Sequence, residues 1–278
     1  MFTHEYAKLL REFLLSTLAD LKMCLIVFSY KQNADYPLIF AANRDEHYER
    51  PSRTAQFWEE NPNILAGKDL KADGTWMGIN KDGEFSAVTN YRDPDIEKKD
   101  PPSRGKLVLD FLQNNESAPE YLSKLQSHAD QYMGFNLLAG SLNKLGYYSN
   151  QQNDILLLDS GLYGLSNHLL ETSWPKVQRA KKNLSHIIQD DSIAPEPLFD
   201  LLADDHEAPE EELPDTGIPK DIEKKVSPIF IKSDGYGTRC STVLLIDHNG
   251  KATFAERRFK PGTMEVEEEN QYHFSIEK

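Results

Sequence analysis

The sequence predicts an α+β protein whose sheets are largely antiparallel. Two turn signals support this prediction, because Asp82-Gly83 and Asn249-Gly250 each separate two strand-like apolar segments, as in a tight β-hairpin. The predicted helices are clustered along the chain instead of alternating with single strands, so a parallel βαβ sheet is not expected. The chain shows no internal repeat and no linker that divides it.

The first half of the chain begins with a predicted hairpin. Residues 24–30 form a compact apolar run that predicts a buried strand, and residues 38–42 are its expected partner. The charge-dense stretch 43–54 is predicted to be a loop. Two further strands are expected on either side of Asp82-Gly83, over residues 76–79 and 84–89.

The second half contains the predicted helices. A polar, proline-containing loop at 93–104 precedes a helix over 105–112, and Ser117 with Glu120 forms a capping box that starts a helix reaching about Ala129. An acidic, proline-rich loop is expected at 204–219. The remaining expected elements are strands at 135–139, 145–149 and 155–158, a helix at 174–188, and strands at 240–246 and 252–258.

The composition excludes several classes of function. The chain has 278 residues and a formal net charge of −14, so binding to nucleic acid is not expected and membrane contact is at most transient. Only two cysteines are present, which favours a reducing, cytoplasmic location. The eight histidines are scattered, so we expect no metal site and no required cofactor. No pattern predicts an oligomeric state.

The first 22 residues form a predicted amphipathic helix that precedes a second methionine. Residues 1–22 are interpreted as an N-terminal extension, either upstream of the true start or removed later, and residues 23–278 as a single domain. A packed terminal helix is the structural alternative. If the working chain starts after Met23, Cys24 carries a free α-amine.

An N-terminal cysteine has its own general base. The α-amine has a pKa of about 7.7–8.0 and a free thiol about 8.5, so the amine of Cys24 can take the proton of its own thiol. The thiolate can then attack a carbonyl carbon. The alternative is a buried strand cysteine without chemistry.

The segment Asn43-Arg44-Asp45-Glu46 follows the predicted partner strand, and a hairpin returns it to Cys24. Arg44 can lower the thiol pKa and hold a substrate anion, and Asp45 can orient the amine. The structural alternative is a cluster of surface ion pairs that contributes little stability.

Several ordered motifs make the chain similar to a known family. They are Met23-Cys24, Asn43-Arg44-Asp45-Glu46, Gly74-Thr75-Trp76-Met77-Gly78, Thr89-Asn90-Tyr91-Arg92, Ser103-Arg104-Gly105, Gly134-Phe135-Asn136-Leu137, Gly164-Leu165-Ser166-Asn167 and Tyr236-Gly237-Thr238-Arg239. From Met23 to about Arg258 the chain resembles the NRDE family, also called the transport-and-Golgi-organisation-2 family. Members typically begin at the Met-Cys pair, and this chain departs from that by its extension.

The resemblance implies the N-terminal-nucleophile hydrolase fold, a four-layer αββα sandwich. It implies Cys24 as the nucleophile flanked by Arg44 and Asp45, with Asn90 and Asn167 as oxyanion donors. The same resemblance implies that Arg239 stabilises developing charge. The additional candidate ligand-binding residues are Asn43, Glu46, Trp76, Arg92, Arg104 and His168. Turn caps for the asparagines, a core role for Trp76 and an inter-strand ion pair for Arg239 are the alternatives.

Six arginines fall in or near the motifs of this acidic chain, and their convergence would create a positive pocket for an anionic small molecule. They are Arg44, Arg50, Arg53, Arg92, Arg104 and Arg239.

Two classes of function remain open. The resemblance implies handling and trafficking of haem, as a cargo, or of an anionic lipid or acyl-coenzyme A. For haem the conceivable ligands are Cys24, His47, His168 and Met77. The alternative is an N-terminal-cysteine amidohydrolase or thioesterase that acts on an acylated anionic small molecule.

Overall fold

A computed structural model describes residues 23–93, 98–114, 116–190 and 192–277. The expected extension at 1–22 therefore lies outside the described residues, as do residues 94–97 of the loop expected at 93–104. The described chain forms two seven-stranded sheets, and every strand pair in them is antiparallel, which confirms the predicted class.

The first sheet, sheet A, contains the N-terminal hairpin and the C-terminal strands. Its order is β10-β1-β2-β12-β13-β14, and β11 also pairs with β12. The strands are β1 (Cys24–Tyr30), β2 (Leu38–His47), β10 (Gly161–Leu165), β11 (Lys232–Ser233), β12 (Tyr236–Ile246), β13 (Lys251–Phe259) and β14 (Val266–Ser275).

The second sheet, sheet B, follows chain order from β3 to β9. Its strands are β3 (Ser52–Phe57), β4 (Ile64–Asp69), β5 (Met77–Asn80), β6 (Phe85–Asn90), β7 (Phe135–Gly140), β8 (Leu145–Ser149) and β9 (Asp154–Leu157). The hairpin predicted around Asp82-Gly83 is the pair β5–β6, and Gly83 has the positive φ of 84° that this turn requires.

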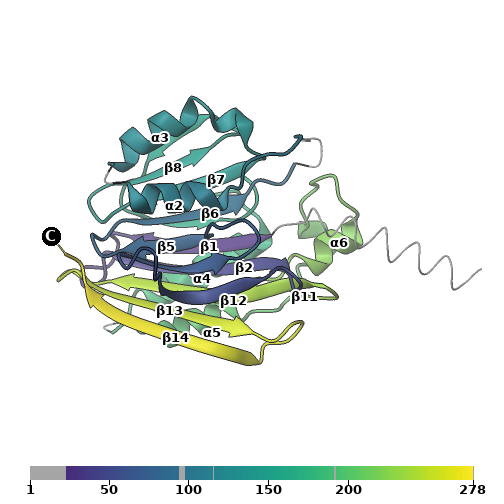
Figure 1. Ribbon diagram of the computed structural model, residues 1–278. Helices are drawn as coiled ribbons and strands as arrows, with labels where there is room; N and C mark the ends of the chain where they lie inside the picture. The colour runs from purple at the N-terminus through teal and green to yellow at the C-terminus, as the bar shows by residue number, and fades with distance from the viewer. Residues whose placement is uncertain (1–22, 94–97, 115, 191, 278) are drawn as a thin grey trace, which may run out of the picture.

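Helices cover the outer face of each sheet (Figure 1). The helices α2 (Gly105–Gln113) and α3 (Ala118–Gln126) pack on sheet B, and α4 (Pro175–Ile187) and α5 (Pro195–Leu202) pack on sheet A. The short elements are α6 (Lys220–Lys225), η1 (Ala129–Gln131) and η2 (Glu210–Glu212). The capping box at Ser117 and Glu120 is present at the start of α3, and that helix ends before Ala129.

Three apolar cores hold these layers together. One fills the space between the sheets and includes Phe28, Phe40 and Phe85. The other two lie between sheet A and its helices and between sheet B and its helices. The order of layers is therefore helices, sheet B, sheet A, helices, which is the expected αββα sandwich.

The stretch 43–54 differs from its prediction. It is not one loop, because β2 continues to His47 and β3 begins at Ser52. The strand β12 pairs with β2 along its whole length, from Ile246 opposite Leu38 to Tyr236 opposite His47. The charged residues therefore lie in the middle of sheet A, where neighbouring strands shield them from water.

Candidate functional site

A cavity of about 300 Å³ opens at the end of the sandwich where β1 begins. On one side of it lie the first residue of β1 and the last residues of β2. On the other side lie the residues just before β5 and the first residue of α2. Its polar lining is Cys24, Arg44, Asp45, Glu46, Arg50, Asp69, Thr75, Asn90, Ser103 and Arg104, and Trp76, Val88 and Met133 are its large apolar residues. The sequence motifs around Cys24, Arg44, Trp76, Asn90 and Arg104 therefore meet at one place.

Cys24 lies at the floor of this cavity, at the first position of β1 and opposite Arg44. Its backbone N–H donates to Asn167 Oδ1 at 3.0 Å, and Ser166 Oγ donates to its carbonyl at 2.8 Å. The side chain is partly exposed to the cavity. Burial raises the pKa of the Cys24 thiol to about 12, and the negative charge of Asp45 adds to the rise. With Met23 attached, the thiol is therefore protonated at neutral pH.

The alternation along β2 divides its charged end between two faces. Ile26 and Ala42 face the core between the sheets, so Cys24 and Arg44, each two residues away on the same strands, face the same side. Asn43 belongs to the opposite face, where its amide donates to two backbone carbonyls at 2.9 Å.

Arginines and carboxylates are paired at the cavity wall. Arg44 lies 3.6 Å from both Glu46 and Asp69, and Arg50 lies 2.7 Å from Asp69. Burial alone would raise the pKa of Asp69, but the hydrogen bond and the charge of Arg50 outweigh burial and hold it below its usual value. The Arg44 guanidinium also stacks 4.4 Å from the centre of the Trp76 ring.

The expected convergence of six arginines on one pocket occurs only in part. Only Arg44, Arg50 and Arg104 of the six arginines line the cavity, and three carboxylates line it as well. The positive charges are therefore largely balanced.

Arg104 differs from the other two cavity arginines. Among the residues that the structure describes, it has no carboxylate within ion-pair distance; its Nη1 donates to the Gly134 carbonyl at 2.8 Å. Burial lowers the pKa of Arg104 to about 10, while Cys24 and Glu46 oppose this change. The guanidinium thus remains charged at neutral pH.

A backbone contact holds Arg104 at the rim. The N–H of Thr75 donates to the Gly105 carbonyl at 3.1 Å, and a Cβ on Gly74 would lie 2.6 Å from the Gly105 carbonyl carbon. Only glycine permits this approach between the β4–β5 turn and the first residue of α2, directly after Arg104.

Asp45 lines the cavity but is almost fully buried. Thr238 Oγ1 donates to its Oδ1 at 2.6 Å, and its Oδ2 has no hydrogen-bond partner among the described residues. Burial raises the pKa of Asp45 to about 6, although the charge of Lys176 opposes this rise. Burial likewise lowers the pKa of Lys176 to about 8. Lys176 lies on α4, and no local motif in the sequence marks it.

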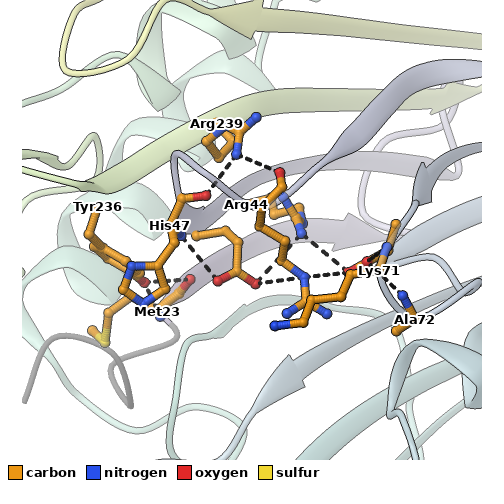
Figure 2. Close-up of polar contacts among 10 residues, drawn as sticks. Met23, Arg44, His47, Lys71, Ala72, Tyr236 and Arg239 are labelled. Atoms are coloured by element: carbon orange, nitrogen blue, oxygen red, sulfur yellow. Dashed lines mark hydrogen bonds and ion pairs between the residues drawn. The ribbon is translucent and has the colours of Figure 1, made fainter. Parts of the chain in front are cut away.

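Met23 is held by Tyr236 and Arg92. Its N–H donates to the hydroxyl of Tyr236, its sulfur contacts the guanidinium of Arg92, and it is 1 % exposed. Figure 2 shows Met23 and Tyr236 next to His47, near the charged end of β2. The residue that precedes Cys24 is thus as firmly packed as the core.

Asn167 positions the backbone around Cys24. Its Oδ1 accepts the Cys24 N–H, and its Nδ2 donates to the Asn90 carbonyl at 2.9 Å. Asn90 lines the cavity, whereas Asn167 does not. Of the two predicted oxyanion donors, only Asn90 therefore lines the cavity, and Asn167 holds the backbone of Cys24 in place.

Besides Asn167, four predicted site residues do not line the cavity. Arg92 pairs with Glu223 at 2.9 Å, and His168 bonds the hydroxyls of Tyr91 and Thr172, each at 2.9 Å. Arg239 occupies a β-bulge in β12, and its side chain donates to the carbonyl of His47, as Figure 2 shows. It also donates to the carbonyl of Arg50 at 3.0 Å. Asn43 is the fourth, on the helix side of β2.

Asp69 and Lys176 are the site residues that sequence reasoning missed. Asp69 ends β4 and pairs with Arg50 across the cavity wall, and Lys176 reaches the site from a different layer. Both depend on contacts between distant segments, which no local pattern in the chain signals.

The fold and this cavity define a four-layer αββα protein with a cysteine at the floor of a polar pocket. The chain belongs to the Transport and Golgi organisation 2 family, whose model matches residues 23–261. A Mus musculus relative, "Transport and Golgi organization 2 homolog", is 37 % identical over 277 residues, covering 92 % of this chain and 100 % of the relative. The Drosophila melanogaster "Transport and Golgi organization protein 2" is 29 % identical, covering 84 % of this chain and 91 % of that protein.

Solved structures of low sequence identity are also similar. A mutant conjugated bile acid hydrolase from Clostridium perfringens has a TM-score of 0.48 and 12 % identity, covering 91 % of this chain and 97 % of that one. A Caenorhabditis elegans N-acylethanolamine-hydrolyzing acid amidase ortholog has a TM-score of 0.44 and 8 % identity, covering 80 % and 92 %. In the described part of the chain, no helix is long and apolar enough to span a membrane.

Proposed function

We propose that the protein binds an acylated small anion, such as an acyl-coenzyme A or an acyl amide of an amino acid, with the acyl carbonyl over Cys24. The observation that carries this proposal is Arg104, a half-buried cation that lines the same cavity as Cys24 and has no carboxylate partner among the described residues. Such a group gains from an anionic ligand, because a charge-assisted hydrogen bond is roughly twice as strong as a neutral one.

The positions of the conceivable haem ligands favour an acyl anion over haem. Of the conceivable haem ligands, only Cys24 lines this cavity. His168 is bonded through both ring nitrogens, His47 packs against Tyr236, and Met77 is buried in the core.

Binding ranks ahead of hydrolysis because of the Cys24 thiol. With Met23 attached, the nitrogen of Cys24 is an amide that already donates to Asn167, and the thiol pKa of about 12 leaves almost no thiolate at neutral pH. A protonated thiol without a free amine supports ligand binding ahead of attack on the carbonyl.

Hydrolysis is the second candidate, for a form of the protein that begins at Cys24. Asn167 already holds the Cys24 nitrogen, and Asn90 lines the cavity beside the thiol. In that form the amine would take the thiol proton, and the sulfur would bond to the acyl carbon. The leaving amine or thiol would then receive the proton, and water would hydrolyse the acyl thioester to release the acid.

Calorimetric titration with butanoyl-coenzyme A and with N-butanoylglycine tests the binding proposal. Replacing Arg104 by methionine should weaken binding about 10–150-fold, the effect of removing a charged hydrogen bond worth about 1.5–3 kcal/mol. Lys106→Met is the matched control, because Lys106 is exposed on α2 and does not line the cavity. Equal effects of the two substitutions, or no binding of either compound, would refute the proposal.

Intact mass after incubation with the same two compounds tests the hydrolytic candidate, using protein whose first residue is Cys24. A mass increase equal to the butanoyl group, absent from Cys24→Ala, is the expected result. Unmodified protein and unchanged compounds would exclude hydrolysis of these two acyl classes and leave the binding proposal standing.

A further inference from the structure

A second, smaller cavity of about 20 Å³ opens next to the Cys24 cavity and extends between the two sheets. The two cavities share Cys24, Arg44, Trp76 and Val88. Beyond these shared residues, Ile26 and Ala42 line it from sheet A, and Met77 and Ala87 line it from sheet B. We refer to this space as the inner chamber.

Two alanines create the inner chamber. Stacked sheets lie about 10 Å apart, so side chains from both sides must fill the space. Ala42 and Ala87 are too short to do so. Two residues further along the same strands, Phe40 and Phe85 face the same core, and their rings meet edge to face with centroids 6.3 Å apart. The chamber therefore lies where both strands carry alanine, and the phenylalanine pair lies deeper in the same core, beyond the residues that line the chamber.

The lining of the inner chamber is apolar in effect. Three polar residues line it besides Cys24. The Asn43 side chain points to the other face of sheet A, Thr242 bonds Glu256 at 3.0 Å, and the Arg44 guanidinium lies over the Trp76 ring and near Glu46. A space of this size holds about one water molecule or methyl group, and an apolar lining offers water few partners. A hydrocarbon group is the occupant that this chemistry favours.

We infer that the inner chamber is the subsite for the apolar end of a short, unbranched acyl group, in the range from acetyl to butanoyl. The inference rests on the proposed function, which places the acyl carbonyl over Cys24. Ala42 and Ala87 then determine specificity for chain length. A longer chain must displace Phe40 and Phe85, which are fully buried. The anionic part of the ligand lies on the other side of Cys24, toward Arg104.

Titration with free, acetyl-, butanoyl- and octanoyl-coenzyme A tests this inference. Burying one methylene strengthens binding about fourfold, so affinity should rise from free to acetyl- to butanoyl-coenzyme A. It should then fall at least tenfold for octanoyl-coenzyme A, because its chain meets the phenylalanine pair.

Three variants locate the effect in the inner chamber. Ala87→Val fills the chamber, so butanoyl-coenzyme A should bind no better than acetyl-coenzyme A. Ala139→Val is the matched control, because it adds the same volume to the neighbouring strand β7 on the opposite face of sheet B. Phe85→Leu deepens the chamber and should strengthen binding of octanoyl-coenzyme A. Circular dichroism of each variant verifies that it is folded.

The outcomes separate the two proposals. If no coenzyme A thioester and no acyl amide binds, the proposed function fails and the inference fails with it. If butanoyl- and octanoyl-coenzyme A bind equally well and folded Ala87→Val changes neither, the inner chamber is not the acyl subsite, while the proposed function stands.

Discussion

Gly67 on β4 lies directly beneath the ring of Trp76, and this contact gives a sharp prediction. A Cβ added at Gly67 would lie 2.3 Å from both Cη2 and Cζ2 of the indole. Carbon atoms in favourable contact are about 3.5–4.0 Å apart, so the ring must move by more than 1 Å. The Gly67 backbone does not have a positive φ, so a Gly67→Ala substitution acts through this collision alone.

The expected loss of stability has two parts. Overpacking a tight site costs about 1–3 kcal/mol. The displaced indole also loses part of its stacking with Arg44, an interaction worth about 0.5–2 kcal/mol. We therefore expect Gly67→Ala to lower the free energy of unfolding by about 2–4 kcal/mol, and to weaken binding of butanoyl-coenzyme A, because Trp76 lines both cavities.

Urea unfolding of Gly67→Ala, Trp76→Leu and the double variant measures this effect. If the collision is the cause, Gly67→Ala costs at least about 1 kcal/mol less in the Trp76→Leu background, which leaves room for the new methyl group. A near-UV circular dichroism change in Gly67→Ala alone would report the moved indole. A loss below about 0.5 kcal/mol with an unchanged near-UV spectrum would refute the close contact between Gly67 and Trp76.

Three further predictions concern buried charges and the thiol. Burial raises the Asp45 pKa from 3.8 to about 6, so the folded state retains a proton that the unfolded chain has released between these values. The free energy of unfolding should therefore fall as pH rises through this window, by at most about 3 kcal/mol relative to the Asp45→Asn variant. Parallel pH profiles of the two proteins would contradict this prediction. Arg92→Met leaves Glu223 buried without its partner and should lower the free energy of unfolding in urea by about 3–5 kcal/mol. An additional Glu223→Leu substitution should restore part of this loss. Additive losses would show that the pair is not coupled. In a Cys240→Ala protein that retains Met23, iodoacetamide should modify Cys24 at pH 8 at least 100-fold more slowly than it modifies free cysteine. The reason is that a pKa of about 12 leaves little thiolate. A rate near that of free cysteine would mean that the thiol pKa is not raised.

The hairpins of the fold could be predicted because their signals are local. Asp82-Gly83 and Asn249-Gly250 mark the turns of β5–β6 and β12–β13, and the apolar run of residues 24–30 is β1 in full. The antiparallel class follows from these turns. Strand β14 carries Glu267, Glu268 and Glu269 at an exposed sheet edge, so its composition resembles a loop and only its pairing with β13 makes it a strand.

The candidate site was predictable only in part. The motif residues Cys24, Trp76 and Arg104 meet in the cavity, but their spacing gave no sign that Asp69 would neutralise the nearby arginines. Charge density predicted a loop at 43–54, because a sequence does not show which charges will be paired and buried. The decisive partner there is β12, which lies nearly two hundred positions away in the chain.

The position of Asn43–Glu46 in the centre of sheet A explains how four consecutive polar residues can serve two purposes. Residues that alternate along a strand face opposite sides of the sheet. Arg44 and Glu46 face the cavity, where they pair with each other and with Asp69 and Arg50. Asn43 ties β2 to the carbonyls of Leu202, at the end of α5, and of Ile229.

This division makes the effects of substitutions separable. Replacing Asn43 removes bonds between layers and should act through stability, whereas Glu46→Gln changes the charge of the cavity wall and should act on binding. A variant that changes all four residues would lose function for two unrelated reasons. Only substitutions that respect the alternation can therefore show whether the cavity or the fold is responsible for a loss of activity.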